Sequence, residues 1–534
     1  MQLRAADRVL SGKLALLATL WPTIASLAAG CSEPEELRVS TPPHRKPART
    51  APSAEPAAAP GASGRGTLRE NVPAYLSVAT KPEPVARVYA KTRFVWIRPE
   101  PRHDTQWIGY MWTGGSVALK SDVPVTGAGC RAWYAVEPRG YVCVDGKRAT
   151  LNGDDPVLAR LRPYVARLDT PWPHRYAESN GAELYKALPS SDEQKRREWD
   201  LTDHLGRLER ARKGDIHPTL AGVDPAQATG KPFELLDLPS TIHEARERLR
   251  PRSTVAYSEE VYANGRSWLF TADFRWFPKD RAKPYPVVEF RGVELGEGVS
   301  LPLAFFRSAE RPKYRRTDAG FELEGSTWPR LSWVKLTDRR IEQEGRTFLE
   351  TADGQWVDAE DAVVPTPRDK TPWGASVGAK DETGLMRGRR TWLQASIWGG
   401  WLIAYEGTRP VYVTLISPGR GGTPVPGKDP LETASTPTGR FPITGKFATA
   451  TMVAPHEFVH SDVPWTQNFS GPHALHGAYW HDDWGRRKSA GCINVSPEDG
   501  RWLFAFTEPP LPEGWHGVRW LPSLEPATTF IVHD

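Results

Sequence analysis

A histidine, a serine and a cysteine lie close together near the C-terminal end of the sequence, in the segment HGAYWHDDWGRRKSAGCIN at residues 476–494. A cysteine attacks a carbonyl carbon as the thiolate. A free thiol has a pKa of about 8.5, so near neutral pH Cys492 needs a base beside it, and His476 is the natural candidate. Gly491 has no side chain, which predicts close approach of a substrate carbonyl to backbone N–H groups that would hold its oxyanion. The segment therefore predicts nucleophilic catalysis by a cysteine.

This segment resembles the catalytic domain of the L,D-transpeptidases (YkuD-like), whose pattern is His-Gly or His-Ser, a variable stretch, and then Ser-His-Gly-Cys-x-Asn or -Arg. The residues that fill the pattern are His476, Gly477, Ser489, Gly491, Cys492 and Asn494. Ala490 departs from it, because the family usually has a second histidine there. Since His476 is retained, we expect this departure to tune the activity and not to abolish it. The segment TPTGRF at residues 436–441 matches a further family segment, and the resemblance covers most of residues 389–533.

The resemblance implies a cysteine acyltransferase that cross-links peptidoglycan stem peptides and requires no cofactor and no metal. Cys492 would attack the carbonyl between the third stem residue and its terminal D-alanine, and would pass the acyl group to an amine of a neighbouring stem. His476 would take the thiol proton, and the backbone carbonyl of Gly477 would fix its ring. Ser489 and Asn494 are expected to shape the loop on the substrate and oxyanion side, together with Gly491.

Three alternatives stay open at this point. With water as acceptor the same site is an L,D-carboxypeptidase, and with a protein amine it attaches that protein to the cell wall. A zinc site of His473, His476, His481 and Asp482, with or without Cys492, is disfavoured because its HxxH pair lies in a loop bounded by glycine and proline. A wall-binding domain without catalysis is the third, with Ala490 as the sign of lost activity. Further candidate substrate contacts are His473, His481, Trp465, Tyr479 and Trp480.

Length and composition favour a mainly β protein of several domains. A chain of 534 residues is long enough for three or four domains at roughly 150 residues each. Its 50 prolines and 46 glycines favour short strands and turns over long helices. The excess of 69 basic over 64 acidic residues is small, which argues against a dedicated nucleic-acid-binding protein.

The first thirty residues have the features of an export signal. Arg4, Arg8 and Lys13 precede an apolar run at residues 14–29, which ends in LAAGC. This predicts a lipoprotein anchored through Cys31 in the bacterial cell envelope, on the periplasmic side of the outer membrane; the alternative is an ordinary signal peptide. In an oxidising compartment Cys130 and Cys143 are expected to form a disulfide, and the alternative is two buried thiols.

Composition shifts divide the rest of the chain. We expect a signal peptide at residues 1–30, a disordered tether at 31–70, a small β-barrel at 71–150 and a β-rich accessory region with a helical insertion at 151–385. The run at 71–150 resembles a bacterial SH3-like domain. The resemblance to the L,D-transpeptidases implies a catalytic β-sandwich with a short helix after the cysteine at 386–534. The SH3-like domain is expected either to bind peptidoglycan or to act as a spacer. The helical insertion is predicted from a capping Ser191 through Trp199 to Gly214, and Asn264-Gly265 predicts a hairpin turn.

Overall fold

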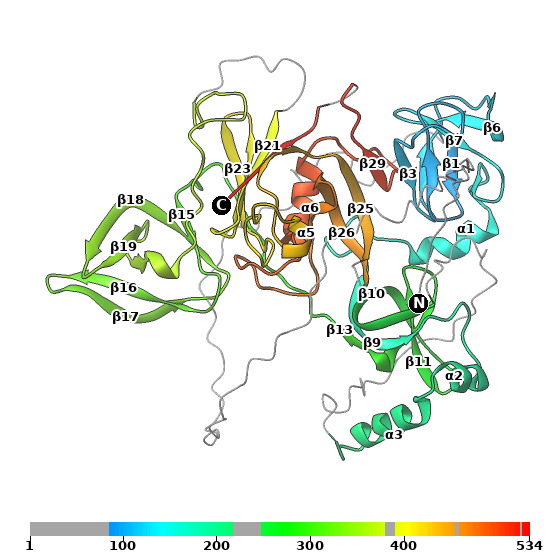
Figure 1. Cartoon of the computed structure of the whole chain (residues 1–534), viewed down its shortest axis with the longest axis horizontal. Helices are drawn as coiled ribbons and strands as arrows, with labels where there is room; N and C mark the ends of the chain where they lie inside the picture. The colour runs from blue at the N-terminus through cyan, green and yellow to red at the C-terminus, as the bar shows by residue number, and fades with distance from the viewer. Residues whose placement is uncertain (1–84, 217–246, 380–389, 454–458, 524–525) are drawn as a thin grey trace, which may run out of the picture.

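The computed structural model describes residues 85–216, 247–379, 390–453, 459–523 and 526–534 (Figure 1). The predicted signal peptide, Cys31, the tether and the first residues of the predicted SH3-like domain lie outside this part. Within it the protein is mainly β and multidomain, and its strands form six sheets. No helix among the described residues is both long and apolar enough to cross a membrane.

Two large sheets form the C-terminal sandwich. The first has the order β2-β3-β29-β25-β26-β27-β28, and the second has the order β14-β23-β22-β21-β30-β24. The strands of the first are β2 (Val95–Ile97), β3 (Gly109–Met111), β25 (Gly445–Val453), β26 (Val459–Ser470), β27 (His473–Gly477), β28 (Ile493–Val495) and β29 (Gly517–Arg519). Those of the second are β14 (Val293–Glu294), β21 (Thr391–Ser396), β22 (Trp401–Glu406), β23 (Arg409–Leu415), β24 (Gly439–Pro442) and β30 (Thr529–His533). Side chains of both sheets fill one core, including Leu402, Phe469 and Ile493.

The helix α6 (Pro497–Phe506) packs into this core, next to β26 (Figure 1). Its start follows from the sequence, because Ser496 accepts a hydrogen bond from the N–H of Asp499 and Pro497 occupies the first turn. Asp499 is fully buried and accepts hydrogen bonds from the hydroxyls of Tyr412 and Thr414, and from the N–H of Gly292. This one carboxylate therefore links α6 to β23 and to the accessory region.

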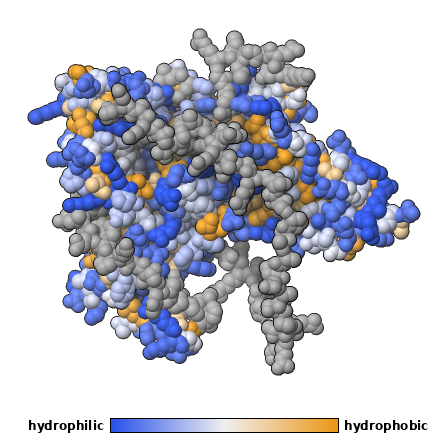
Figure 2. Space-filling view, turned by 180° about the vertical axis from the view of Figure 1, so that it is seen from behind, coloured by the Kyte–Doolittle hydropathy of each residue, from blue (hydrophilic) through white to orange (hydrophobic). Residues whose placement is uncertain are grey.

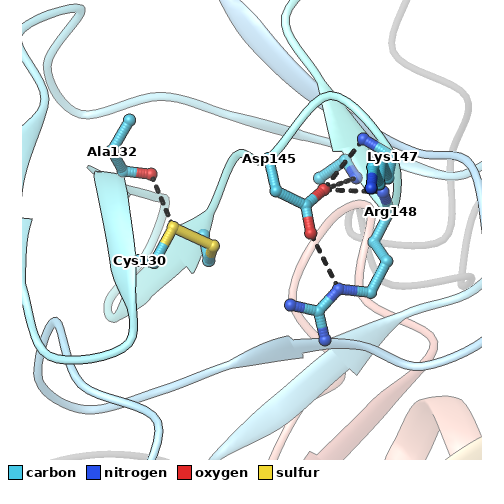
Figure 3. Close-up of a disulfide and its surroundings, with 7 residues drawn as sticks. Cys130, Ala132, Asp145, Lys147 and Arg148 are labelled. Atoms are coloured by element: carbon cyan, nitrogen blue, oxygen red, sulfur yellow. Dashed lines mark hydrogen bonds and ion pairs between the residues drawn. A yellow bond between two sulfur atoms is a disulfide. The ribbon is translucent and has the colours of Figure 1, made fainter.

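The N-terminal part is continuous with the C-terminal sandwich. It contains the small sheets β4-β1-β8 and β5-β6-β7, but its strands β2 and β3 extend the seven-stranded sheet through β29. The strands of the small sheets are β1 (Arg87–Ala90), β4 (Ser116–Ala118), β5 (Val125–Gly127), β6 (Cys130–Ala135), β7 (Tyr141–Cys143) and β8 (Ala149–Thr150). Cys130 and Cys143 form a disulfide between β6 and β7 (Figure 3). An SH3-like domain with a boundary at residue 150 stays a prediction.

The accessory region begins with the sheet β12-β11-β10-β9-β13. Its strands are β9 (Arg175–Glu183), β10 (Arg248–Ala263), β11 (Arg266–Thr271), β12 (Trp276–Pro278) and β13 (Ala282–Pro284), and the short helix α1 (Pro156–Leu161) precedes them. The predicted hairpin is confirmed: Ala263 pairs with Arg266, and Asn264 and Gly265 between them both have positive φ angles.

The single predicted helix is wrong, because the chain forms two helices, α2 (Ser191–Arg197) and α3 (Leu201–Arg212). Ser190 caps the first one in place of Ser191. The helix breaks because the carboxylates beside Trp199 are drawn to distant arginines: Glu198 binds Arg266 at 2.7 Å and Asp200 binds Arg281 at 2.6 Å. Trp199, through which the predicted helix runs, is 86% exposed in this break.

A second accessory sheet has the order β15-β18-β19-β20-β16-β17. Its strands are β15 (Leu303–Phe305), β16 (Arg311–Thr317), β17 (Gly320–Trp328), β18 (Trp333–Gln343), β19 (Arg346–Thr351) and β20 (Trp356–Asp358). It forms a lobe that projects from the left of Figure 1 and the right of Figure 2, where its surface is mostly hydrophilic. The short helix α5 (Pro430–Thr433) lies between β23 and β24 in the chain.

Replacing Asp499 with alanine is expected to destabilise the fold by about 3 kcal/mol or more. The variant leaves two buried hydroxyls and a backbone N–H without their acceptor, and each such loss typically costs about 1–3 kcal/mol. Chemical denaturation followed by tryptophan fluorescence measures the change. Glu513→Ala is the matched control, because its carboxylate is 66% exposed in an ion pair with Arg87 and its removal should cost under about 1 kcal/mol.

Candidate active site

Parallel pairing of β27 with β28 brings the predicted base and nucleophile together. In this ladder Leu475 is opposite Ile493, and His476 is opposite Asn494. Side chains two positions apart on a strand share a face, so Cys492, just before β28, faces the same side as His476. The N–H of Ala474 points at the sulfur, at 3.4 Å from Sγ. His476 and Cys492 are therefore diagonal neighbours on one face of the sheet.

The imidazole of His476 is fixed in one tautomer. Nδ1 lies 3.1 Å from the carbonyl oxygen of Gly477, and because a carbonyl only accepts, Nδ1 carries the proton. Nε2 then has a lone pair, and this buried atom has no hydrogen-bond partner among the described residues. Burial lowers the pKa of His476 to about 4, so the ring is neutral at neutral pH. The side chain has the form that a general base needs.

Aromatic and apolar side chains cover the sulfur. Both Cys492 and His476 have 0% exposure. Met452, Val463 and Ala474 pack around Cys492, and Trp480 is the partly exposed side chain of this cluster. The ring of Trp480 lies 5.7 Å from that of His476, between centroids. Among these side chains Trp480 is the one that is only partly buried.

Ser489 and Gly491 shape the turn that carries the thiol. The Ser489 hydroxyl donates to the carbonyl of Cys492 and accepts from the N–H of Gly491, at 3.1 Å from that nitrogen. The Gly491 N–H is thus occupied by the turn itself. Gly491 has a φ of +129°, and a Cβ there would lie 2.8 Å from both His473 Nε2 and the carbonyl oxygen of Ser435. Glycine is required here by backbone conformation and by the packing of His473.

Asn494 and His481 form a second polar contact beside the base. The side-chain amide of Asn494 lies 3.0 Å from His481 Nε2, and its Oδ1 is buried without a partner among the described residues. The backbone of Asn494 pairs in both directions with Ser417, which connects β28 to the end of β23. Burial lowers the pKa of His481 to about 3, so this ring is neutral as well.

The accessory region holds the loop between His476 and Cys492 from one side through Tyr479. The Tyr479 hydroxyl lies 2.6 Å from Thr254 Oγ1 and donates to the carbonyl of Ser461. Its ring stacks on Tyr176 at 3.6 Å. The sequence suggested Tyr479 as a substrate contact. Its contacts with β9 and β10 instead show that it packs against the accessory region.

The lobe of β15 to β20 and the segment before it hold the other side of the loop. Arg330 pairs with the carboxylate of Asp482 at 2.8 Å and also donates to its carbonyl. Arg307 donates to the carbonyl of Gly485 at 2.9 Å. The accessory region, to which the sequence assigns no chemistry, thus fixes the fifteen residues between His476 and Cys492 at several points.

Two imidazoles extend the site beyond the predicted pair. His473 is buried next to Gly491, and His460 stacks on Trp480 with 4.4 Å between ring centroids. Burial lowers the pKa of His460 to about 4, and its Nδ1 has no partner among the described residues. Sequence reasoning missed His460, which lies in β26, outside the motif, and only strand pairing brings it near.

Trp465 does not join the site, since its fully buried ring packs against Phe504 in another core and donates to the carbonyl of Pro171. Among the described residues no group of three or more His, Cys, Asp or Glu side chains has an arrangement that would hold a metal ion. The histidines that the sequence suggested as zinc ligands instead contact separate protein groups.

Residues 400–517 match the family model of the L,D-transpeptidase catalytic domain, YkuD. Similar solved structures include an L,D-transpeptidase from Stackebrandtia nassauensis, which is 19% identical, with 29% of this chain and 61% of that chain covered and a TM-score of 0.19. An L,D-transpeptidase in complex with imipenem is 13% identical over 42% of this chain and 78% of that chain, with a TM-score of 0.20. One from Mycobacterium smegmatis is 14% identical over 50% of this chain and 90% of that chain, with a TM-score of 0.21.

No curated protein matches the chain. The family match lies inside the predicted catalytic range and contains His476, Cys492 and the segment between them. Residues 400–517, about a fifth of the chain, are therefore similar to the L,D-transpeptidase catalytic domain described by the YkuD family model.

Proposed function

We propose that this protein is a peptidoglycan L,D-transpeptidase that forms cross-links between stem peptides through an acyl-enzyme on Cys492. The observation that carries the proposal is the lone pair of His476 Nε2, which is buried, without a partner among the described residues, and on the same face as the sulfur. His473 Nε2, His460 Nδ1 and Asn494 Oδ1 are further buried polar atoms with no partner in the described part. Such atoms are costly unless a ligand satisfies them, and the amide groups of a peptide are suited to do so.

In the first step the proton of the Cys492 thiol passes to His476 Nε2, and the sulfur attacks the carbonyl before the terminal D-alanine. The carbon–nitrogen bond then breaks, and His476 returns the proton to the leaving amine. In the second step an amine of a neighbouring stem attacks the thioester and gives its proton to His476. The carbon–sulfur bond breaks, and the thiol is restored. The Gly477 carbonyl keeps the ring in the tautomer that both steps need.

The acceptor and the location complete the proposal. Peptidoglycan stem peptides are the partners, the chain is a lipoprotein held in the cell envelope through Cys31, and its N-terminal domain contacts the wall. Water as acceptor would make the protein an L,D-carboxypeptidase, and a protein amine would make it a ligase of protein to wall. Digests of sacculi incubated with the purified enzyme separate these outcomes: cross-linked dimers support the proposal, whereas shortened monomers alone, or protein-linked stems, would replace it.

Incubation with imipenem is expected to add one adduct to the reduced full chain, measured by intact mass. The reason is that a carbapenem presents a strained carbonyl to the same nucleophile, and an L,D-transpeptidase in complex with imipenem is among the similar structures. Cys492→Ala should gain no adduct. His476→Gln should form it about 100-fold more slowly or less, since proton transfer by a positioned base typically contributes about 10²–10⁴-fold.

Tyr134→Phe in the N-terminal part is a suitable control that should react like the original protein. An adduct that survives in Cys492→Ala would mean that another group is acylated. A chain that gains none, although it is folded and reduced, would favour a wall-binding domain without catalysis.

As the pH is lowered, the rate of acylation is expected to fall to half its maximum near pH 4. This is well below the ordinary histidine pKa of about 6.5. His476 acts as a base only when it is neutral, and burial lowers its pKa to about 4, so the fraction in the active form stays high down to that pH. Rates measured from pH 4 to 8, with circular dichroism at each pH to follow folding, provide the test. A half-maximal rate near pH 6.5 in folded protein would contradict this role for the buried ring.

A further inference from the structure

His473 is a second imidazole beside the thiol that the mechanism above does not use. It is 3% exposed and begins β27, three positions before the base. Its Nδ1 lies 3.2 Å from the carbonyl oxygen of Ser470, so Nδ1 is the protonated nitrogen. Burial, the largest effect, lowers the pKa of His473, so the ring is neutral at neutral pH and Nε2 presents a lone pair. This nitrogen can accept a hydrogen bond but cannot donate one.

The lone pair of His473 Nε2 lies close to the turn that carries Cys492. The atom is buried and has no hydrogen-bond partner among the described residues. It sits against the backbone of Gly491, the residue before the nucleophile, so closely that a Cβ on Gly491 would be 2.8 Å away. Ala490, the residue before Gly491, has only a methyl side chain and cannot donate a hydrogen bond from it. A buried acceptor without a donor costs free energy, and a bound molecule at the thiol would remove that cost.

We propose that His473 is a substrate-binding residue whose Nε2 accepts a hydrogen bond from an amide N–H of the acyl-donor peptide. The bond would fix the peptide beside Gly491 and place its carbonyl over Cys492. The inference rests on the proposed function, because it assumes that a peptide is acylated there. His476 and His473 then have different roles because of their different positions. The first exchanges a proton with the sulfur, whereas the second keeps its tautomer and holds the donor peptide.

The test compares two acyl donors on the reduced full chain. His473→Phe keeps a ring in place but removes the acceptor, and it should lower kcat/KM for a stem tetrapeptide by about 10- to 100-fold, mainly through KM. Acylation by imipenem, which lacks the peptide's amide N–H groups, should change by less than about 3-fold. His473→Gln, whose amide oxygen can accept, should recover much of the loss with the tetrapeptide.

The outcomes separate the two proposals. If the unchanged protein is acylated by neither compound, the proposed function fails. If it is acylated by both, and His473→Phe either matches it or loses both reactions equally, the binding role is wrong and His473 only supports the turn. Should His473→Phe fail to fold, His473→Leu replaces it as the variant without an acceptor, and equal tetrapeptide kinetics in His473→Leu and His473→Gln would overturn the proposal.

Discussion

The parallel pairing of β27 with β28 is the constraint on which the candidate site depends. A parallel pair needs a long connection, and the residues between His476 and Cys492 supply it. Because the register sets His476 opposite Asn494, it also sets which side chains share a face with the sulfur. A shift by one residue would turn His476 to the other face and separate base from nucleophile. The chemistry is therefore specified by backbone hydrogen bonds before any side chain is considered.

The long connection explains why the chain outside the sandwich matters. A segment of this length would lose much conformational entropy on ordering, and its own short turns offer few contacts to offset that loss. The accessory sheets supply the contacts, through Tyr176 and Thr254 on one side and through Arg330 and Arg307 on the other. Strands β2 and β3 also extend the seven-stranded sheet, since β3 pairs with β29 and β2 pairs with β3. The additional residues thus act as a frame around the site.

The sequence predicted those features of the fold that depend on residues close together in the chain. The turn at Asn264 and the cap at Ser496 follow from residues within a few positions, and the motif residues define the turn around Cys492. The sequence did not predict features that depend on contacts between residues far apart in the chain. The break between α2 and α3 depends on Arg266 and Arg281, which are remote in sequence from the carboxylates that they bind. Nothing local marks His460, since only the pairing of β26 brings it to Trp480.

Burial of His476 imposes an energetic condition on its proposed role as a base. The same desolvation that lowers the pKa of His476 to about 4 penalises the imidazolium that forms when it takes a proton. Among the described residues, the hydrogen-bond partner of the ring is the carbonyl of Gly477, which is neutral and brings no negative charge to balance the imidazolium. Proton transfer therefore becomes favourable only when the sulfur's negative charge develops beside the ring, or passes on to the substrate. In the proposed reaction, the buried geometry thus favours proton transfer coupled to attack over a permanent thiolate–imidazolium pair. The thiolate would then form only when a peptide is bound.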